Sequence, residues 1–372
     1  MPHISLTSNT AWNLYNFRGG VIRALLQEGY QVSTLAPPDP FSQRLAALGC
    51  NVIDLTIDNK GSNPLRDLET HQAFKRIYRQ LRPDVALHYT IKPVIYGTLV
   101  AHREKIPIIN TITGLGTAFL RKGWLMYIAE QLYRHSLHRS QKVFFQNRDD
   151  CEIFLQRHLI QRDKVEILAG SGIDLQRFSS TPYPATAEET RFLLIARLLW
   201  DKGVGEYIAA ARQIKATHPS ARFQLLGPLG VANRTAVPPQ EVERWVTEGV
   251  IEYLGESDDV RPHIEQAHCI VLPSYREGLP RTLLEAAAMA RPIITTNVVG
   301  CKEVVDDPES GYLCRVQDAA DLANAMQRFL HLSRAQQAEM GHKGRAKVEQ
   351  QFDEQQVIHR YLKTIRTAQE AA

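Results

Sequence analysis

The sequence predicts an α/β protein made of two consecutive Rossmann-like domains, each with a doubly wound parallel sheet. Its 372 residues are too many for one domain of ordinary size and about right for two. Short β-branched runs alternate with longer segments of helical periodicity along the chain, which is the pattern of parallel βα units. A stretch rich in Ser, Thr and Pro after Phe178 separates two such series and is the expected linker.

These signals set the expected domain boundaries. Residues 1–178 form the first predicted domain, residues 190–352 the second, and residues 353–372 a final helix. The strands predicted for the first domain are Ile4–Thr7, Val32–Leu35, Val52–Leu55, Val85–His88, Ile108–Ile112, Val143–Phe145 and Val165–Leu168. Those predicted for the second are Phe192–Ala196, Phe223–Leu226, Ile251–Leu254, Cys269–Leu272, Ile293–Thr296 and Tyr312–Cys314. Ligands bind at the carboxyl ends of such strands, so the functional candidates are sought there.

The composition is that of an ordinary globular protein, with 44% hydrophobic and 23% charged residues. No apolar run approaches the roughly 18 residues of a membrane span, and the first residues lack the pattern of a secretory signal. The five scattered cysteines form no CxxC pair, which disfavours disulfides or a zinc site and favours the cytoplasm. Residues 1–175 carry 21 Lys and Arg against 15 Asp and Glu. This excess favours an anionic partner, phosphate or a membrane surface, with an ordinary solvated surface as the alternative.

The most informative segment runs from Glu277 to Glu285 and reads EGLPRTLLE. It leads from a predicted strand through a loop into a helix whose first turn holds Pro280, where a missing N–H has no cost. The amides of that turn and the positive end of the helix dipole form a phosphate site. Glu277 lies on the loop and Glu285 inside the helix, so one carboxylate can face a sugar ring while the other reaches a ribose hydroxyl. Taken singly, each is more often an exposed charge.

A second segment, ARLLWDKG, places two cations after the first strand of the second domain. Arg197 and Lys202 stand at the carboxyl end of that strand, where together they can hold a diphosphate. A guanidinium binds phosphate oxygens bidentately, and lysine acts as a point charge. The alternative interpretation is a pair of solvated cations beside Asp201.

Several missing motifs narrow the chemistry. The sequence has no GxxxxGK[ST] loop and no GxGxxG after a strand, which disfavours P-loop ATPases and nicotinamide or flavin enzymes. It also has no Asp-x-Asp pair to hold a metal on a nucleotide diphosphate. We therefore expect no metal and no cofactor, with the leaving-group charge met by Arg197, Lys202 and helix ends. The modest charge excess and the lack of a reader motif disfavour nucleic acid as a partner.

With these motifs the sequence resembles the retaining glycosyltransferases of family 4, which have the GT-B fold, over essentially the whole chain. The family's Glu-x7-Glu pattern falls on Glu277 and Glu285, and its Arg-x4-Lys-Gly pattern falls on Arg197, Lys202 and Gly203. The resemblance implies two Rossmann-like domains that face each other across a cleft, with the last helix crossing back onto the first domain.

The resemblance also implies roles at the donor site. Arg197 and Lys202 would hold the diphosphate of a UDP-sugar, Glu285 would bind the ribose, and Glu277 would orient the donor sugar and stabilise its developing charge. The family's glycine loop after the first strand corresponds to Gly19 and Gly20 and would contact the donor. The backbone of Gly278, Leu279 and Pro280 would lie near the donor phosphates.

One departure from the family concerns a histidine that many members carry near the donor sugar, because Thr113 stands in its place here. His88 and Tyr89, at the end of another predicted strand, are candidate substitutes. A histidine at such a place is more often structural. The sequence therefore assigns no general base.

The first domain resembles the branch of the family that builds bacterial surface glycans on polyprenyl diphosphates. The expected acceptor contacts lie at presumed loops after strands: Arg18, Lys60, Lys92 and Thr113. For the three basic residues, ordinary surface cations are the alternative. In Phe119–Phe145 basic residues flank aromatic and apolar ones, which favours an interfacial helix on anionic lipid. A core helix with solvated flanks is the other interpretation.

Together these features and the family resemblance imply a retaining, metal-independent hexosyltransferase bound peripherally at the cytoplasmic, inner face of the plasma membrane. It would move an N-acetylhexosamine or hexose from a UDP-sugar to a lipid-carrier-linked saccharide in bacterial surface glycan synthesis, forming an α-linkage. The alternatives are a UDP-sugar 2-epimerase of the same fold and a non-catalytic nucleotide-sugar-binding protein.

Overall fold

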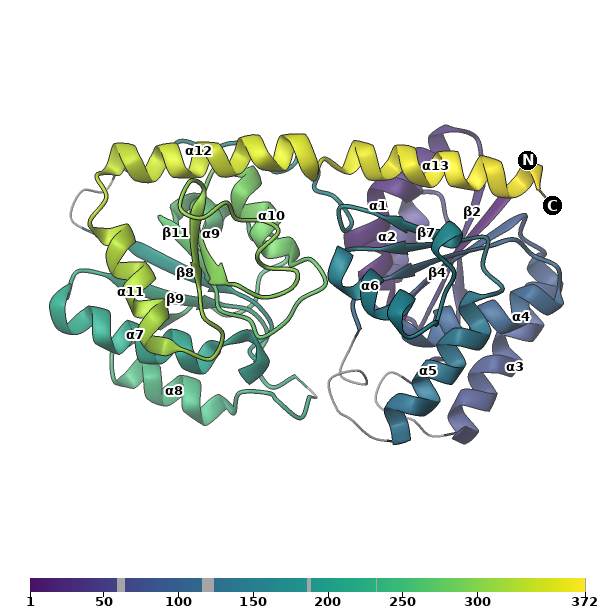
Figure 1. Ribbon diagram of the computed structural model, residues 1–372, viewed down its shortest axis with the longest axis horizontal. Helices are drawn as coiled ribbons and strands as arrows, with labels where there is room; N and C mark the ends of the chain where they lie inside the picture. The colour runs from purple at the N-terminus through teal and green to yellow at the C-terminus, as the bar shows by residue number, and fades with distance from the viewer. Residues whose placement is uncertain (59–63, 116–123, 186–188, 232, 372) are drawn as a thin grey trace. The chain divides into compact units, whose positions relative to one another are not determined.

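The computed structural model describes residues 1–58, 64–115, 124–185, 189–231 and 233–371, and the chain forms two compact units (Figure 1). The first unit comprises Met1–Ser171 with the C-terminal segment from Glu354, and the second comprises Gly172–Asp353. Each contains one parallel sheet between helices. This confirms the predicted α/β class with two doubly wound, Rossmann-like units.

The sheet of the first unit has the strand order β3-β2-β1-β4-β5-β6-β7. The strands are β1 (His3–Thr7), β2 (Gln31–Ala36), β3 (Asn51–Asp54), β4 (Val85–Tyr89), β5 (Ile108–Ile112), β6 (Lys142–Phe145) and β7 (Val165–Ile167). Leu6 of β1 is aligned with Thr34 on one side and with Leu87 on the other. The chain order reverses at β1 and β4, and such a switch point is where ligands bind in folds of this type.

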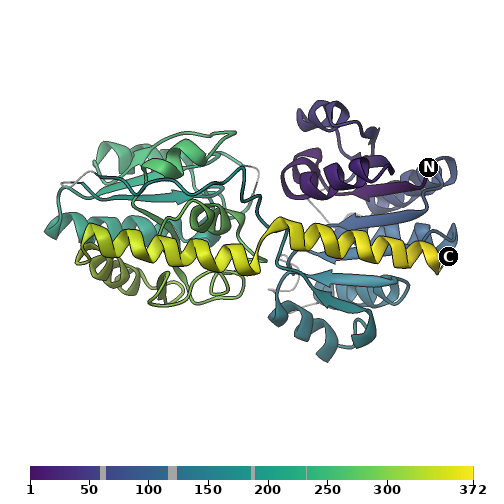
Figure 2. The same cartoon turned by 90° about the horizontal axis from the view of Figure 1, so that it is seen from above.

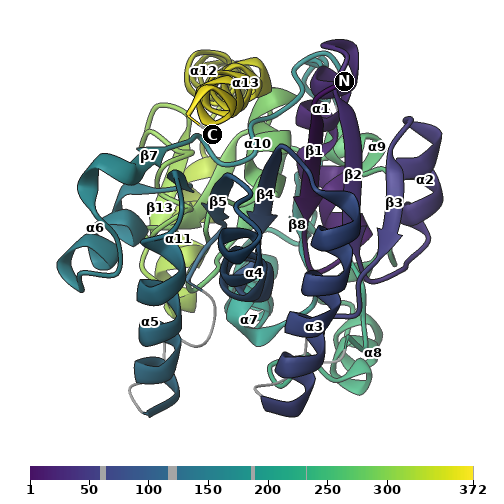
Figure 3. The ribbon, with the colours of Figure 1, turned by 90° about the vertical axis from the view of Figure 1, so that its right-hand side faces the viewer.

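Alternating side chains of the strands point to two helical layers. Ile4 and Leu6 pack on one face with α1 (Ala11–Gln27), α2 (Phe41–Ala47) and α13 (Glu354–Glu370). The other face packs against α3 (Pro64–Leu81), the π-helix η1 (Pro93–Gly97), α4 (Thr98–Arg103), α5 (Trp124–Leu137) and α6 (Arg148–Gln156). Figure 3 shows α3, α4 and α5 as neighbours on this face.

The last helix, α13, packs on the first unit and extends along it (Figure 2). Val357, Tyr361 and Ile365 lie in the same core as α1, and the Tyr361 hydroxyl lies 2.6 Å from Thr111 Oγ1. The apolar side chains one turn apart are the signal that predicted this amphipathic helix.

The sheet of the second unit has the strand order β10-β9-β8-β11-β12-β13. The strands are β8 (Arg191–Ile195), β9 (Arg222–Leu226), β10 (Glu252–Tyr253), β11 (Cys269–Leu272), β12 (Ile293–Thr296) and β13 (Gly311–Cys314). The helices are α7 (Val204–Thr217), α8 (Pro239–Thr247), α9 (Arg261–Gln266), α10 (Arg281–Ala288), α11 (Ala319–Leu330) and α12 (Arg334–Gln351). The order reverses at β8 and β11, so the ends of these two strands flank the switch point.

The chain passes from one unit to the other at Ser171 and Gly172, earlier than the expected boundary at residue 178. The following residues pack on the second unit: the Ile173 N–H donates to the Phe352 carbonyl oxygen at 2.8 Å, and Arg345 Nη1 donates to the Phe178 carbonyl oxygen at 2.8 Å. The segment rich in Ser, Thr and Pro that follows is also held against the second unit, because Arg291 donates to the carbonyl oxygens of Thr181 and Pro182.

Candidate donor site and its family

The loop between β11 and α10 holds Glu277 through three contacts. Its Oε1 atom accepts a hydrogen bond from Ser274 Oγ at 2.7 Å and forms an ion pair with Lys202 Nζ. Its backbone N–H donates to the Val299 carbonyl oxygen at 3.1 Å. The side chains of Lys202 and Glu277 are only 19% and 13% exposed, so their interpretation as solvated charges is wrong.

Two glycines let neighbouring backbone segments approach this loop. Gly203 has a φ of +72°, and a Cβ atom there would lie 2.0 Å from the Pro273 carbonyl oxygen. Gly300 has a φ of +88°, and its Cβ would lie 2.5 Å from the Glu277 carbonyl oxygen. Only glycine fits such left-handed, crowded positions. Gly203 thereby brings Lys202, the residue before it, against the loop.

The helix α10 begins at Arg281, and Pro280 is its N-cap residue with φ −73° and ψ 115°. Pro280 therefore lies one position before the first turn of α10, whereas the sequence placed it within that turn. No side chain caps this helix, and the N–H groups of a first turn have no acceptor within the helix. Gly278 and Leu279 lie half-buried on the preceding loop. An uncapped helix start of this kind suits an anion, and the phosphate site that the sequence predicts here stays a prediction.

Glu285 lies one turn inside α10 and pairs with Arg281, whose Nε donates to Glu285 Oε1 at 3.0 Å. The side chains of Arg281 and Glu285 are 16% and 13% exposed, so Glu285 is not an exposed helix charge. Burial raises the pKa of the Glu285 carboxyl, and Arg281 opposes this shift. The helix thus presents a largely desolvated carboxylate.

Arg197 follows β8 and its side chain is exposed. Within the described ranges its guanidinium has no hydrogen-bond or ion-pair partner. Asp201 does not neutralise the neighbouring Lys202, because its Oδ2 accepts from Thr235 Oγ1 at 3.0 Å while Lys202 pairs with Glu277. The structure brings Lys202 and Glu277 into contact and leaves Arg197 as a separate cation after the same strand.

Three further residues belong to this site and were not predicted from the sequence. Ser274 and Arg281 bond the two glutamates. Cys301 is buried, and burial together with the charge of Glu277 raises the pKa of its thiol to about 12. The four-residue spacing of Arg281 and Glu285 was a readable signal. No sequence signal indicates Ser274 or Cys301, because their contacts depend on how the loops after β11 and β12 meet.

The expected glycine loop at Gly19 and Gly20 is wrong. Both residues lie within α1, whose N-cap is Thr10. A Cβ at Gly20 would lie 2.7 Å from Glu354 Oε2, so this glycine leaves room for the carboxylate at the start of α13. Glycine often marks close backbone approach rather than a turn, and the sequence alone did not distinguish the two.

Arg18 is not a surface cation, because only 2% of it is exposed. Its guanidinium carbon lies 4.4 Å from the centroid of the Tyr89 ring, a cation–π contact. In the part of the chain that the structure describes, Nε and Nη1 have no hydrogen-bond partner. An arginine keeps its charge in proteins, so this is a buried cation with unmet donors.

The other expected acceptor residues are Lys92, Thr113 and Lys60, and none of those that the structure describes is a buried cation like Arg18. Lys92 Nζ lies 2.7 Å from Asp67 Oδ1, and the Tyr96 hydroxyl donates to Asp67 Oδ2 at 2.9 Å. Lys92 is therefore engaged in an ion pair and is not a free surface cation. Thr113 follows β5 and is half-buried. Lys60 lies outside the described residues.

His88 is buried in a polar network that does not reach solvent. One ring nitrogen, Nε2, lies 2.7 Å from the Tyr78 hydroxyl, and the other, Nδ1, lies 3.1 Å from Asn110 Oδ1. Burial lowers the pKa of His88 to about 3, so the ring is neutral. Tyr89 is also fully buried. Neither residue replaces the family's histidine, and the structural interpretation of His88 holds.

The structure describes the expected membrane element, Phe119–Phe145, only from residue 124 onward, which is α5 and the residues after it. Tyr127 and Ile128 are 63% and 44% exposed, while Tyr133 is buried. The helix therefore has one side in the core and exposes apolar side chains on another, which combines parts of both interpretations. No helix in the described ranges has both the length and the apolar character to span a membrane.

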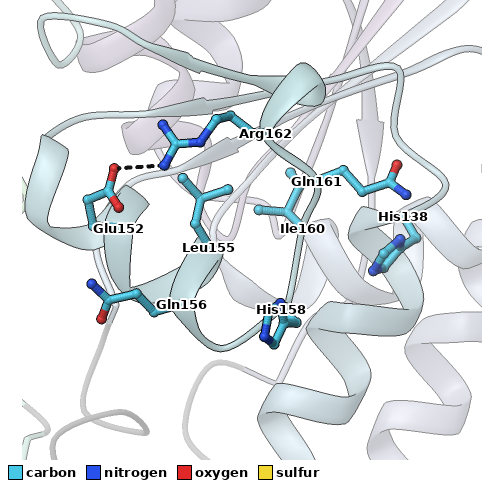
Figure 4. A pocket seen from close by; sticks show the side chains of 8 residues that line it. All are labelled: His138, Glu152, Leu155, Gln156, His158, Ile160, Gln161 and Arg162. Atoms are coloured by element: carbon cyan, nitrogen blue, oxygen red, sulfur yellow. Dashed lines mark hydrogen bonds and ion pairs between the residues drawn. The ribbon is translucent and has the colours of Figure 1, made fainter.

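A surface pocket of about 530 Å³ lies elsewhere in the first unit (Figure 4). Its lining includes His138, His158 and the ion pair of Glu152 with Arg162, whose Oε1 and Nη2 atoms are 3.5 Å apart. These residues precede β6 and β7 or end the helices that lead to them. The pocket is thus at the amino ends of the strands, away from the edge where parallel sheets bind ligands.

Two family models match the chain. "Glycosyl transferase 4-like" matches residues 3–147, and "Glycosyl transferases group 1" matches residues 189–331. The chain is 26% identical to the N,N'-diacetylbacillosaminyl-diphospho-undecaprenol alpha-1,3-N-acetylgalactosaminyltransferase of Campylobacter jejuni, over 97% of each chain. It is 33% identical to the putative colanic acid biosynthesis glycosyltransferase WcaL of Escherichia coli, over 57% of this chain and 53% of that protein.

Solved structures share the fold over the whole chain. Sucrose-phosphate synthase from Thermosynechococcus elongatus has a TM-score of 0.81 at 20% identity and covers 100% of both chains. Anabaena HepE in complex with UDP and glucose has a TM-score of 0.81 at 16% identity, covering 99% of this chain and 100% of its own. The chain belongs to the family 4-like glycosyltransferases with the GT-B fold, and it is a hexosyltransferase by class.

Proposed function

We propose that this enzyme transfers a hexose or N-acetylhexosamine from a UDP-sugar to a saccharide carried on a polyprenyl diphosphate, retaining the α-configuration. The observation that carries the proposal is the ion pair of Lys202 with Glu277 beside the uncapped end of α10. A cation for the leaving phosphate and a carboxylate for the sugar must be neighbours, because the bond that breaks joins these two parts of the donor.

The donor diphosphate is the ligand we assign to Arg197, Lys202 and the first-turn amides of α10. Two cations and a helix N-terminus can together stabilise the charge of the leaving UDP, so no divalent ion is required. When the diphosphate attracts Lys202, Glu277 Oε1 becomes available to the hydroxyls of the donor sugar. Ser274 keeps its hydrogen bond to the same atom and so maintains the orientation of the carboxylate. Glu285 accepts hydrogen bonds from the ribose.

The acceptor assignment is supported by the relative from Campylobacter jejuni, whose name specifies a diphospho-undecaprenol-linked saccharide. In the first unit, Arg18 is a buried cation with unmet donors after β1. A phosphate is the kind of group that offsets such a charge. Lys92 and Thr113, which follow β4 and β5, are the other acceptor contacts in this proposal.

A polyprenyl acceptor is confined to a membrane, so the enzyme must work at its surface. We assign the contact to α5 and the basic segment around it, because Tyr127 and Ile128 are exposed in the first half of this helix and its last turn carries Arg134 and His135. Aromatic, aliphatic and basic groups in this order suit an anionic lipid interface. The inner face of the plasma membrane is the corresponding location.

The proposal is tested with a panel of UDP- and GDP-sugars and polyprenyl-diphosphate-linked saccharides, in EDTA. We expect UDP release that depends on both substrates, with a product whose new anomeric bond is α by NMR. UDP release that does not depend on the acceptor would contradict transfer. An epimer formed from UDP-N-acetylhexosamine alone would contradict it too and would favour the 2-epimerase. Loss of activity in EDTA, restored by a divalent ion, would contradict the metal-free mechanism.

A further inference from the structure

We propose that Arg281 is a positioning residue for the donor nucleotide, which holds the Glu285 carboxylate charged and oriented for the ribose. The inference rests on the proposed function, in which Glu285 binds the ribose. It adds a residue that acts through Glu285 and is not itself required to touch the donor.

The contact between the two side chains is direct. Arg281 is the first residue of α10, and its Nε donates to Glu285 Oε1 at 3.0 Å. The two side chains are 16% and 13% exposed. A charge-assisted hydrogen bond with so little solvent access fixes the orientation of the carboxylate more firmly than an exposed ion pair does.

This pair is not explained by the stability of the helix. The N-terminus of a helix carries a partial positive charge, so a cation in the first turn is unfavourable and an acidic residue is favourable there. The first turn of α10 has a basic residue, no acidic one and no side-chain cap. An i,i+4 ion pair is also weaker when the basic residue comes first. A residue that opposes the local preference of its helix indicates a functional constraint.

The charges around Glu285 define what Arg281 contributes. Burial raises the pKa of the Glu285 carboxyl, Arg281 and then Arg177 lower it, and Asp259 raises it. Arg281 is on the same helix, Arg177 precedes β8 and Asp259 follows β10. Without Arg281 the pKa of the Glu285 carboxyl should be higher, so a larger fraction of Glu285 should be protonated at a given pH.

Protonation changes what the carboxyl group can do for a ribose. An ionised carboxylate offers two acceptor oxygens to two neighbouring hydroxyls, whereas the neutral acid has a proton on one of them. Donor binding should therefore require the ionised form. Its affinity should be constant at high pH and decrease as the pH falls through the pKa of Glu285.

The experiment measures the dissociation constant of UDP-N-acetylgalactosamine by calorimetry between about pH 5 and pH 8. A UDP-sugar has no terminal phosphate, so it lacks the ionisation near pH 6 that complicates UDP itself. The variants are Arg281→Met, Arg281→Lys, Glu285→Gln and the double variant of Arg281→Met with Glu285→Gln. Arg244→Met is the control, because Arg244 of α8 also forms an i,i+4 ion pair in which the basic residue comes first, with Glu248 at the end of that helix, but this pair is exposed.

For Arg281→Met we expect about tenfold weaker binding at neutral pH and a loss of affinity that begins at higher pH than in the native enzyme. Arg281→Lys retains the charge but not the planar fork and should lie between the two. Glu285→Gln should bind weakly with no such pH dependence, and adding Arg281→Met to it should change nothing further. Arg244→Met should match the native profile.

A native affinity and pH profile in Arg281→Met would overturn the inference, as would additive losses in the double variant. If Arg281→Met does not fold, Arg281→Lys and its own double variant with Glu285→Gln replace it. An unchanged pH profile in Arg281→Lys together with additive losses in that double variant would then overturn the inference. The proposed function fails separately, if Glu285→Gln binds the UDP-sugar as tightly as the native enzyme does. It fails also if the native enzyme binds no UDP-sugar.

Discussion

Lys202 Nζ and Glu277 Oε1 form an ion pair that joins the turn after β8 to the loop after β11. These are the two strands at which the sheet of the second unit reverses its order. The pair has a direct consequence for binding, because a diphosphate that attracts Lys202 must compete with Glu277. If Lys202 holds the donor diphosphate, as proposed, donor binding and the release of the Glu277 carboxylate are coupled through this one lysine.

Replacing Glu277 by Ala should separate binding from transfer. We expect UDP to bind as tightly as before or more tightly, because Lys202 loses its competitor. The turnover number should fall about 100- to 1000-fold, the range found when a group that stabilises a transition state is removed. Calorimetry with UDP and initial rates of transfer measure the two effects, and transfer at the native rate would show that Glu277 has no such role.

Replacing Lys202 by Met should weaken UDP binding about 10- to 100-fold, since a charged hydrogen bond to phosphate is lost. It also leaves Glu277 partly buried without its partner, so the protein should be less stable. The double variant of Lys202→Met with Glu277→Gln should recover that stability but not UDP affinity. Thermal unfolding and calorimetry on both variants check this, and recovery of UDP binding in the double variant would contradict it.

Gly203→Ala should cost about 3 kcal/mol or more of unfolding free energy, because strain at φ +72° adds to a Cβ 2.0 Å from the Pro273 carbonyl oxygen. Gly249 is a matched control, with a φ of +67° and nothing within 4 Å of an added Cβ. Gly249→Ala should cost only about 1 kcal/mol. Urea unfolding compares the two, and equal losses would mean that the close approach to Pro273 is unimportant.

Arg18→Met should leave the unfolding free energy unchanged or raise it by about 1 kcal/mol or more, because a buried cation with unmet donors is removed. If Arg18 binds the acceptor phosphate, the KM for the lipid-linked acceptor should rise about tenfold while UDP affinity stays the same. Arg23→Met removes an exposed arginine from the same helix and should alter neither quantity. A strongly destabilised Arg18→Met with native kinetics would identify a purely structural residue.

His88 should make stability fall in acid. Its pKa is about 3 in the folded protein against 6.5 for the free side chain, so the unfolded chain binds the proton more readily. The stability that neutral His88 contributes is fully present above about pH 6.5 and is lost as the pH falls. At pH 5 the free energy of unfolding should be lower by about 2 kcal/mol for this reason. Urea unfolding of the native protein and of His88→Gln at pH 7 and pH 5 tests this, and identical pH dependence in both would refute it.

The fold class and most strand positions could be predicted because both depend on patterns of neighbouring residues. Alternating buried runs and helical periodicity identify βα units without tertiary information, and Cys269–Leu272 and Ile293–Thr296 match β11 and β12 residue for residue. The linker was placed less well. The Ser-, Thr- and Pro-rich stretch after Phe178 indicated a chain break there, but the chain passes between the units at Ser171 and Gly172, and contacts from Arg345 and Phe352 attach residues 173–178 to the second unit.

At the site, the sequence predicted which strands and loops matter but not how side chains pair. Glu277, Glu285, Arg197 and Lys202 were found from their spacing after strands. That Lys202 bonds Glu277, and that Arg18 is buried, depends on long-range packing. Gly19 and Gly20 illustrate the limit, because a glycine pair can form a loop or lie within a helix, and here both glycines lie within α1.

The most direct test of the central claim is a crystal structure of the enzyme with UDP, grown in EDTA. The account predicts the β-phosphate within hydrogen-bond distance of Lys202 Nζ and the Arg197 guanidinium, the ribose on Glu285, and the ion pair of Lys202 with Glu277 opened. UDP bound away from these residues, or held only when a divalent ion bridges its phosphates, would contradict the claim.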